Sequence, residues 1–198
     1  MLEAIQNRRS IRKFQKSDLP KAVVEQILQA GILAPSSKNR QPWEFIVVAG
    51  AEKVPVLAAM REGIQREKAG EALLPGCRQY LGGAENTLRI MEEAPVTVFV
   101  INPLGGDLTA PQTFEERVYE ICNIQSAGAA LENMTLAATA LGVGSLWICD
   151  LFFAYPELAA CLGVRGELIA AMALGYPGES PVARPRKSVD DVTEWRGI

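Results

Sequence analysis

Three guanidinium groups and a hydroxyl lie within five residues near the start of the chain, at Arg8, Arg9, Ser10 and Arg12. Arginine binds phosphate through paired hydrogen bonds, and a nearby hydroxyl or backbone amide can complete the shell around the anion. The segment therefore indicates a possible phosphate site. Taken alone, a solvated face with ordinary salt bridges is the simpler interpretation.

A second basic cluster stands near the other end of the chain, at Arg184, Arg186 and Lys187. By itself it is typical of a charged tail. If it folds back onto the first cluster, however, the two together form one anion site of a size suited to a phosphomonoester. Each cluster is therefore a stronger candidate for anion binding if the two lie together than it is alone.

The segment 34–48, APSSKNRQPWEFIVV, holds a polar loop between two prolines and then turns into a run typical of a buried strand. Loops on rigid scaffolds commonly bind ligands, because their backbone groups are free to bond to something else. The candidate ligand-binding residues of this loop are Pro35, Ser36, Ser37, Asn39 and Gln41.

A third candidate lies at 142–150, where Gly144 and Ser145 permit close backbone approach and Trp147 offers a flat surface. A tryptophan at such a position is more often part of the core than a ligand platform. The chain has neither GxGxxG nor GxxxxGK[ST], so any nucleotide must bind by another arrangement.

Histidine is absent, and the four cysteines are far apart and form no CxxC pair. These facts exclude Ser/His/Asp and Cys/His catalytic units and make a Cys/His zinc site improbable. The simplest interpretation of the cysteines is four free, buried thiols. Proton chemistry must then come from carboxylates, lysine, tyrosine, a cofactor or water.

A net charge of −3 gives no general attraction to nucleic acid or to an anionic membrane. The chain begins Met1-Leu2-Glu3 without the apolar core of a signal peptide, and no apolar run is long enough to span a bilayer. We therefore expect a cytoplasmic protein with reduced thiols that binds neither nucleic acid nor membrane.

The 198 residues indicate one domain over 1–198, with a variable lobe at about 64–83, of which the part at 70–83 is expected to be mobile and surface-exposed. Asp18 is a plausible cap for a helix that Pro20 opens, and small residues on the longest helix suit a core helix or a subunit interface. Helices are expected at 1–7, 20–32, 53–69, 85–93, 115–141 and 156–162, and strands at 45–48, 95–101 and 168–174. The segment 143–148 is short and apolar, and a weak final element is expected at 189–195. The order favours an α+β fold with a central mixed, mainly antiparallel sheet flanked by helices in three layers.

Four segments, in this order along the chain, together resemble the nitroreductase family of FMN-dependent oxidoreductases. They are RRSIR at 8–12, APSSKNRQPW at 34–43, ALGVGS at 140–145 before Trp147, and LGYP at 174–177 before the basic tail. The resemblance implies a homodimer in which each FMN lies in a groove made by both subunits. NADH or NADPH would be the electron donor, and nitroaromatics or quinones the acceptors.

The resemblance also implies roles for single residues. Arg8, Ser10 and Arg186 would hold the FMN phosphate, with Arg184 or Lys187 assisting, and Arg12 would reach the pyrimidine edge of the flavin. The partner subunit would bring the loop residues Pro35, Ser36, Ser37 and Asn39 to the ribityl chain and ring edge. Arg9 and Gln41 are also candidate FMN-binding residues, because they lie in the same two segments. A cation near the pyrimidine edge stabilises the negative charge of the reduced flavin.

The segment matching Trp147, Ile148, Cys149 and Asp150 runs beside the flavin in the family, where a backbone N–H bonds the ring nitrogen that exchanges hydride. Many relatives have glycine or glutamate where this chain has Cys149 and Asp150, which leaves the donor open. Asn86 either contacts the flavin or caps a helix. A flavin-binding or flavin-processing protein without nitroreductase turnover, and a relative of the reductive dehalogenase type, remain alternatives.

Overall fold

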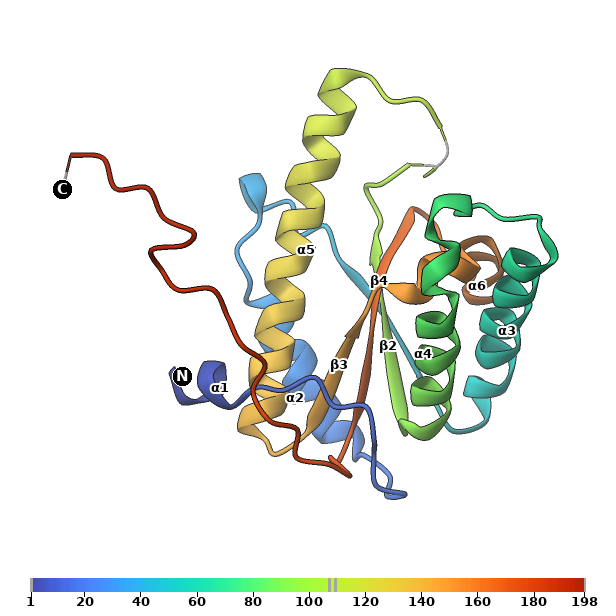
Figure 1. Ribbon diagram of the computed structural model, residues 1–198, viewed down its shortest axis with the longest axis horizontal. Helices are drawn as coiled ribbons and strands as arrows, with labels where there is room; N and C mark the ends of the chain where they lie inside the picture. The colour runs from blue at the N-terminus through green and yellow to red at the C-terminus, as the bar shows by residue number, and fades with distance from the viewer. Residues whose placement is uncertain (1, 107, 109, 198) are drawn as a thin grey trace.

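The computed structural model describes residues 2–106, 108 and 110–197, and it has three layers (Figure 1). A four-stranded sheet forms the middle layer. Its strands are β1 (Glu44–Ala49), β2 (Val96–Asn102), β3 (Gly144–Ile148) and β4 (Glu167–Gly175). One face carries α2 (Lys21–Ile32) and α5 (Phe114–Ala140), with α1 (Leu2–Asn7) beside them, and the other carries α3 (Lys53–Ala69), α4 (Leu81–Glu93) and α6 (Tyr155–Leu162). The predicted α+β architecture is confirmed.

The strands follow the order β1-β2-β4-β3, and every pair of neighbours is antiparallel. All seven residues of β2 and most of β4 are buried, as expected for central strands covered on both faces. The parallel component of the predicted mixed sheet is a bridge between Ser10 and Ser145 at the β3 edge. This bridge attaches the first basic segment to the sheet.

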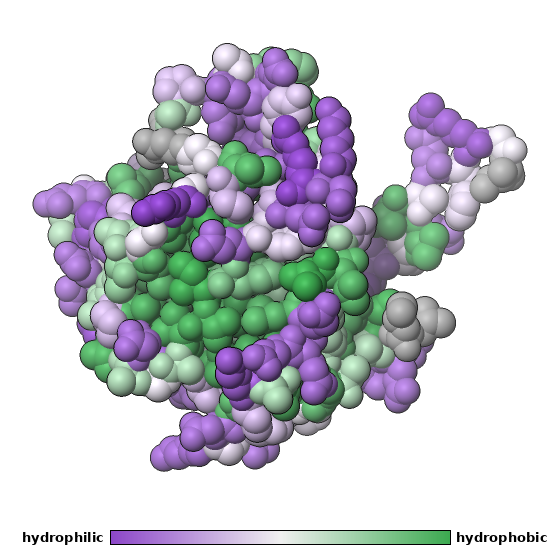
Figure 2. Space-filling model, turned by 180° about the vertical axis from the view of Figure 1, so that it is seen from behind, coloured by the Kyte–Doolittle hydropathy of each residue, from purple (hydrophilic) through white to green (hydrophobic). Residues whose placement is uncertain are grey.

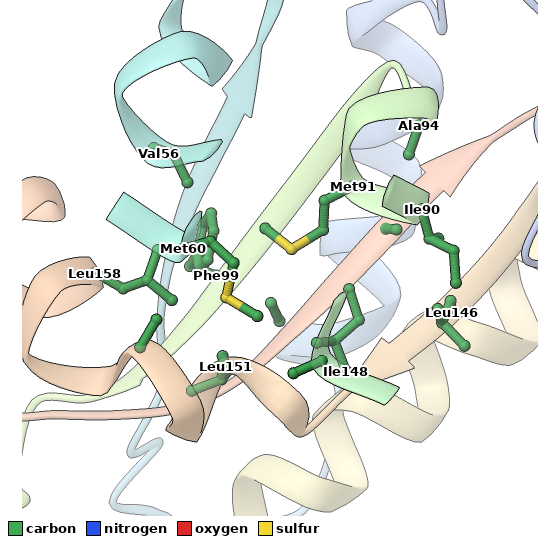
Figure 3. Close-up of a cluster of buried hydrophobic side chains, with 14 of the residues drawn as sticks. Val56, Met60, Ile90, Met91, Ala94, Phe99, Leu146, Ile148, Leu151 and Leu158 are labelled. Atoms are coloured by element: carbon green, nitrogen blue, oxygen red, sulfur yellow. The ribbon is translucent and has the colours of Figure 1, made fainter. Parts of the chain in front are cut away.

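The core between the sheet and the layer of α3, α4 and α6 is built from large apolar side chains (Figure 3). Met60 of α3, Met91 of α4 and Phe99 of β2 are almost fully buried there. Leu151, in the short 3-10 helix η4 (Asp150–Ala154) that follows β3, is also fully buried. Burying such side chains contributes roughly 1.5–3 kcal/mol each, so this core fixes the end of β3 where Cys149 lies.

The other core joins the sheet to α2 and α5. A Cβ added to Gly31 of α2 would come within 2.8 Å of Met134 Cγ on α5, so the glycine allows the two helices to approach closely. Ala127 and Ala138 of α5 are buried in the same core. The small face of α5 is therefore a core face, which was one of its two predicted roles.

Four sequence expectations are wrong. Pro20, not Asp18, occupies the N-cap position of α2, and no side chain bonds to that cap. The helix α4 begins at Leu81 rather than at residue 85, with Leu81 buried and Gly82 and Gly83 on its exposed side. Residues 189–195 form only a turn at 190–192. The four cysteines are free, but all are half-buried or exposed rather than buried.

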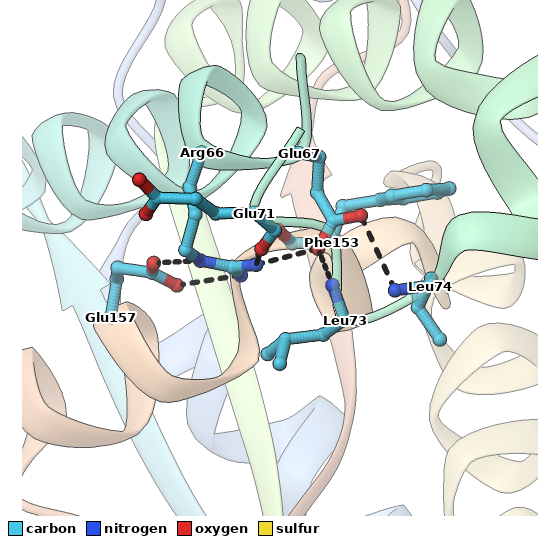
Figure 4. Close-up of polar contacts among 7 residues, drawn as sticks. All are labelled: Arg66, Glu67, Glu71, Leu73, Leu74, Phe153 and Glu157. Atoms are coloured by element: carbon cyan, nitrogen blue, oxygen red, sulfur yellow. Dashed lines mark hydrogen bonds and ion pairs between the residues drawn. The ribbon is translucent and has the colours of Figure 1, made fainter. Parts of the chain in front are cut away.

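The expected lobe at 64–83 comprises the end of α3, a segment at 70–74, the 3-10 helix η3 (Pro75–Tyr80) and the start of α4. Glu67, only 2% exposed, accepts hydrogen bonds from Leu73 N (2.8 Å) and Leu74 N (3.3 Å) (Figure 4). Arg66 bonds Glu67 (2.7 Å) and Glu157 (2.6 Å). The network ties this segment to α3 and α6.

Burial alone raises the pKa of Glu67, but the hydrogen bonds from Leu73, Arg66 and Leu74 outweigh it, and the net pKa lies below its usual range. Glu67→Gln is therefore expected to lower the free energy of unfolding at neutral pH by ~1–3 kcal/mol. Because the folded pKa is depressed, this contribution is present above the pKa of the unfolded carboxyl and is lost as the pH falls through the folded pKa. Urea denaturation at neutral and acidic pH checks both points, with the exposed Glu62→Gln as control. A loss of stability that does not shrink in acid would contradict this assignment.

Candidate functional site

The two basic clusters line one cavity of about 550 Å³ beside α5. Its described lining includes five arginines, one serine hydroxyl and one carboxylate, from Arg8, Arg9, Ser10, Arg12, Arg184, Arg186 and Glu132. The structure thus brings together residues almost 180 positions apart. Lys187, the third member of the second cluster, is exposed and does not line this cavity.

The first basic segment is held against the edge strand β3. Ile11 N–H donates to the Ser145 carbonyl (2.9 Å), and the Ile11 side chain is buried over Gly144. A Cβ on Gly144 would come within 3.0 Å of Ile11 Cγ1, so the glycine provides the space that the isoleucine fills. The close approach that the sequence predicts at Gly144 is therefore made by the Ile11 side chain of the same subunit. Because extended residues alternate in direction, Ser10 and Arg12 face away from that core.

The second cluster is brought to the cavity by pairing of the chain after β4 with the segment at 12–15. Gly178 N–H donates to the Lys13 carbonyl (2.8 Å), and Gln15 N–H donates to the Tyr176 carbonyl (2.9 Å). Glu179 accepts a hydrogen bond from Arg12 N (2.6 Å). The chain then passes along the cavity at 181–186.

The cavity carries a marked excess of positive charge. Among the described residues, ion pairs are recorded for Arg61, Arg66 and Arg89 elsewhere in the fold, but for none of Arg9, Arg12, Arg184 and Arg186. Arg8 has one ion pair, with Glu132, at the long distance of 4.0 Å. Guanidinium groups gathered without carboxylate partners suit a multiply charged anion such as a phosphate monoester.

The loop at 35–41 lies elsewhere, against the N-terminal half of α5. Lys38, Asn39 and Gln41 all have positive φ, near +50°, which is uncommon for residues other than glycine. Ser36 Oγ accepts from Gln41 N (3.0 Å), and Ser37 N donates to Ser126 Oγ on α5 (3.3 Å). Such strained backbone often marks a ligand-binding site. Within one chain, Pro35 and the other predicted loop residues do not line the arginine cavity.

The last part of β3 and the residues after it also lie outside that cavity. Ile148 is buried in the core, whereas Trp147 points to the opposite face and is 38% exposed, near Gly128 of α5. Asp150 accepts a hydrogen bond from Thr87 Oγ1 of α4 (2.7 Å). This bond fixes the start of η4 and leaves Cys149 exposed between β3 and η4.

Although Cys149 is exposed, partial burial of its thiol, together with the negative charge of Asp150, raises its pKa. The thiol is therefore protonated at neutral pH and is a weak nucleophile. Asn86 lies inside α4, where its Oδ1 accepts from Arg89 (2.6 Å). It does not cap that helix, so this alternative is wrong.

Some site residues were missed by sequence reasoning. Glu132 and Glu179 are single acidic residues in ordinary surroundings, and only the fold places them beside the arginines. The buried group Glu120, Asn123 and Glu167 gave a weak signal, since polar residues interrupt an apolar helix and precede an apolar strand.

Among the described residues, no group of histidine, cysteine, aspartate or glutamate side chains is arranged to hold a metal ion. In the same part of the chain, no helix combines the length and the apolar character needed to cross a bilayer.

Comparison with known proteins gives one family. Residues 5–176 match the model of the nitroreductase family. A candidate NADH dehydrogenase/NAD(P)H nitroreductase of Methanothermobacter thermautotrophicus is 30% identical over 192 residues, which cover 93% of this chain and 81% of the relative. The 5,6-dimethylbenzimidazole synthase of Rhodospirillum rubrum is 30% identical over 182 residues, covering 87% and 79%.

Solved structures agree with these matches. A candidate nitroreductase from Desulfovibrio desulfuricans, crystallised with FMN, is similar with a TM-score of 0.72 and 28% identity over 100% of this chain and 97% of that one. The FMN-dependent nitroreductase NfnB from Mycobacterium smegmatis, in complex with NADPH, has a TM-score of 0.76 at 20% identity, covering 98% and 97%. The second match bears on the fold alone.

Proposed function

Because this chain belongs to the nitroreductase family of FMN-dependent NAD(P)H oxidoreductases, we propose that it passes electrons from NADH or NADPH to nitroaromatic or quinone-type acceptors by a ping-pong mechanism. The observation that carries the proposal is the cavity in which five arginines meet without close carboxylate partners. Its charge fits the phosphate of FMN.

Arg8, Ser10 and Arg186 would hold that phosphate, with Arg184 assisting. Lys187, outside the cavity lining, is no longer a favoured contact. The direction of β3 supports the rest of the assignment, because Ser145 lies beside Ser10 and Cys149 follows four residues later. At ~3.3 Å per residue the strand covers about 13 Å, so an elongated cofactor anchored at the arginines can extend toward Cys149. Arg12 would reach the pyrimidine edge of the flavin, and Arg9 would complete the positive wall of the cavity.

The partner subunit would supply Pro35, Ser36, Ser37, Asn39 and Gln41. In support, this loop is held in strained backbone geometry but does not reach the arginine cavity of its own chain. Strain of this kind is stored where the surrounding structure fixes a binding geometry. A site shared between two copies explains both observations.

Three unpartnered apolar surfaces support the homodimer. One is a stripe of exposed apolar side chains on α5, formed by Phe114, Val118 and Ile121. Another is the tail after Gly178, which extends from the body of the molecule (Figure 1) and exposes Val192 and Trp195. β1 is an edge strand of the sheet with Val47 43% exposed. The face turned away in Figure 1 has a broad hydrophobic area bordered by polar side chains (Figure 2). Apolar surface of this extent is typical of an interface.

Bound FMN would supply the hydride and electron chemistry, which needs no protein base. The chain's own residues would hold the phosphate and shape the groove. This division of work explains how a chain without histidine can belong to an enzyme family.

Steady-state kinetics test the proposal. Purified protein should oxidise NAD(P)H rapidly only when a quinone or nitroaromatic acceptor is added, and double-reciprocal plots at several acceptor concentrations should be parallel. Bound FMN that NAD(P)H never reduces would instead favour a flavin-binding protein without turnover.

The similarity to 5,6-dimethylbenzimidazole synthase favours one second candidate, a flavin-processing enzyme. Incubating the reduced protein with oxygen and excess FMN distinguishes the two. Loss of flavin with formation of 5,6-dimethylbenzimidazole would replace the first proposal, whereas intact flavin after many turnovers would support it.

Cys149→Gly is expected to shift the flavin reduction potential or the preference among acceptors while FMN stays bound. The reason is that residue 149 would lie where backbone hydrogen bonding to the flavin tunes its electronics. Redox titration and acceptor kinetics check this, with Cys161→Ser on α6 as the matched control. Unchanged potential and kinetics would show that Cys149 is neutral at this position.

A further inference from the structure

One hydroxyl group links α4 to the start of η4. Thr87 of α4 is only 6% exposed, and its Oγ1 donates to Asp150 Oδ2 over 2.7 Å. The same carboxylate oxygen lies over Gly83, one turn earlier on α4, where an added Cβ would be 3.8 Å from it. The Asp150 carboxylate is therefore held on the surface of α4.

The backbone on both sides of Asp150 is fixed as well. Ile148, at the end of β3, and Leu151 are buried in the core between the sheet and α4 (Figure 3). Phe152 N–H donates to the Cys149 carbonyl (3.3 Å) in the first turn of η4. Between these anchors, the bond from Thr87 is the side-chain hydrogen bond recorded for residues 149–150 in the described part of the chain.

The half-buried Asp150 carboxylate has no positive partner. No ion pair among the described residues involves it, and Lys68 of α3 and Arg89 of α4 pair instead with Glu85 and Glu93. One hydroxyl compensates only weakly for removing a carboxylate from water. A carboxylate kept in such surroundings favours a role for its charge in the site rather than in stability.

The charge of Asp150 acts on the residue that precedes it. Burial, and after it the charge of Asp150, raise the pKa of the exposed Cys149 thiol. According to the proposed function, the flavin would lie beside this same exposed position. Because reduction adds negative charge to a flavin, a fixed carboxylate beside the ring makes its reduction less favourable and the reduced form a stronger reductant.

Building on the proposed function, we propose that Thr87 is a positioning residue for electron transfer, whose hydroxyl holds the Asp150 carboxylate and the backbone at 149–150 in place beside the flavin. In this position the charge of Asp150 lowers the reduction potential of the flavin. The enzyme then favours acceptors that are hard to reduce, such as nitroaromatics, over quinones.

Hydrogen exchange on the flavin-free protein tests the positioning, because it needs no cofactor. Thr87→Val removes the hydroxyl and keeps the shape of the side chain, so the amides at 149–152 should exchange about tenfold faster. Thr87→Ser keeps the hydroxyl and should restore slow exchange. Thr97→Val, at a buried threonine of β2, is the matched control and should leave these amides unchanged. Unchanged exchange in Thr87→Val would overturn the proposal.

Redox titration of the flavin-loaded protein tests the effect of the charge. Asp150→Asn removes the charge but keeps an oxygen that can accept from Thr87. The flavin potential should therefore rise, and the ratio of kcat/KM for a nitroaromatic to that for a quinone should fall about tenfold. Thr87→Val should shift the potential in the same direction, because water screens the released carboxylate, and Thr87→Ser should restore the wild-type value. A potential that neither Asp150→Asn nor Thr87→Val changes would overturn the proposal, whatever the exchange rates.

A failure of the proposed function would be seen in a different sample. It would appear in the wild-type protein, as an absence of bound flavin or as flavin that NAD(P)H does not reduce, and the role of Thr87 in electron transfer would fall with it. Where the wild-type flavin is reduced, the variants alone decide.

Discussion

Replacing Arg8 and Arg186 together with alanine is expected to release FMN from the protein. Each guanidinium would make a charged hydrogen bond to the phosphate worth ~1.5–3 kcal/mol. Loss of both should weaken FMN binding by roughly two to four orders of magnitude. The two residues belong to opposite ends of the chain and line the same cavity, so the variant tests the anion site that the fold assembles. Flavin content after gel filtration and fluorescence titration measure the effect.

Two matched variants make this experiment specific. Arg61→Ala removes an exposed arginine that pairs with Glu92 on the outer helices, and it should leave FMN binding unchanged. Glu132→Gln removes the carboxylate from the arginine cavity and should tighten FMN binding. A double arginine variant that keeps stoichiometric flavin would refute the phosphate assignment.

Val47→Lys is expected to convert the proposed homodimer to monomer and to lower FMN affinity at least tenfold, or ~1.4 kcal/mol. Val47 is exposed on the edge strand β1, and a charge buried without a partner at a subunit interface is costly. FMN affinity should fall with dimerisation because the loop at 35–41 does not reach the arginine cavity of its own chain. Light scattering at micromolar concentration and FMN titration measure the two effects.

Ala160→Lys, at an exposed position of α6 in the outer layer, is the control and should leave both properties unchanged. A monomeric Val47→Lys variant that binds FMN as tightly as the wild-type protein would contradict a site shared between subunits.

The elements with strong periodic patterns were predictable from sequence. The runs of β-branched and aromatic residues that form β1 and β2, and the helix α3, lie within a residue or two of their expected bounds. The start of α4 was missed because Gly82 and Gly83 weaken the local helical signal, although burial of Leu81 stabilises the turn. The cap at Asp18 failed because Pro20 alone fixes the backbone there.

The candidate site was also predictable from the sequence only in part. The meeting of Arg8 with Arg186 followed from the hypothesis that two basic clusters fold together, and the pairing of Phe14 with Pro177 is the contact that achieves it. No local pattern could give that contact, because it depends on how β3 and β4 lie in the sheet.

The most direct test of the central claim is an anaerobic absorption titration of the purified protein with NADH and, separately, with NADPH. The protein as isolated is expected to show a flavin spectrum that at least one donor bleaches stoichiometrically and that a quinone or nitroaromatic acceptor restores. A protein that binds no flavin, or whose flavin neither donor bleaches, would contradict it.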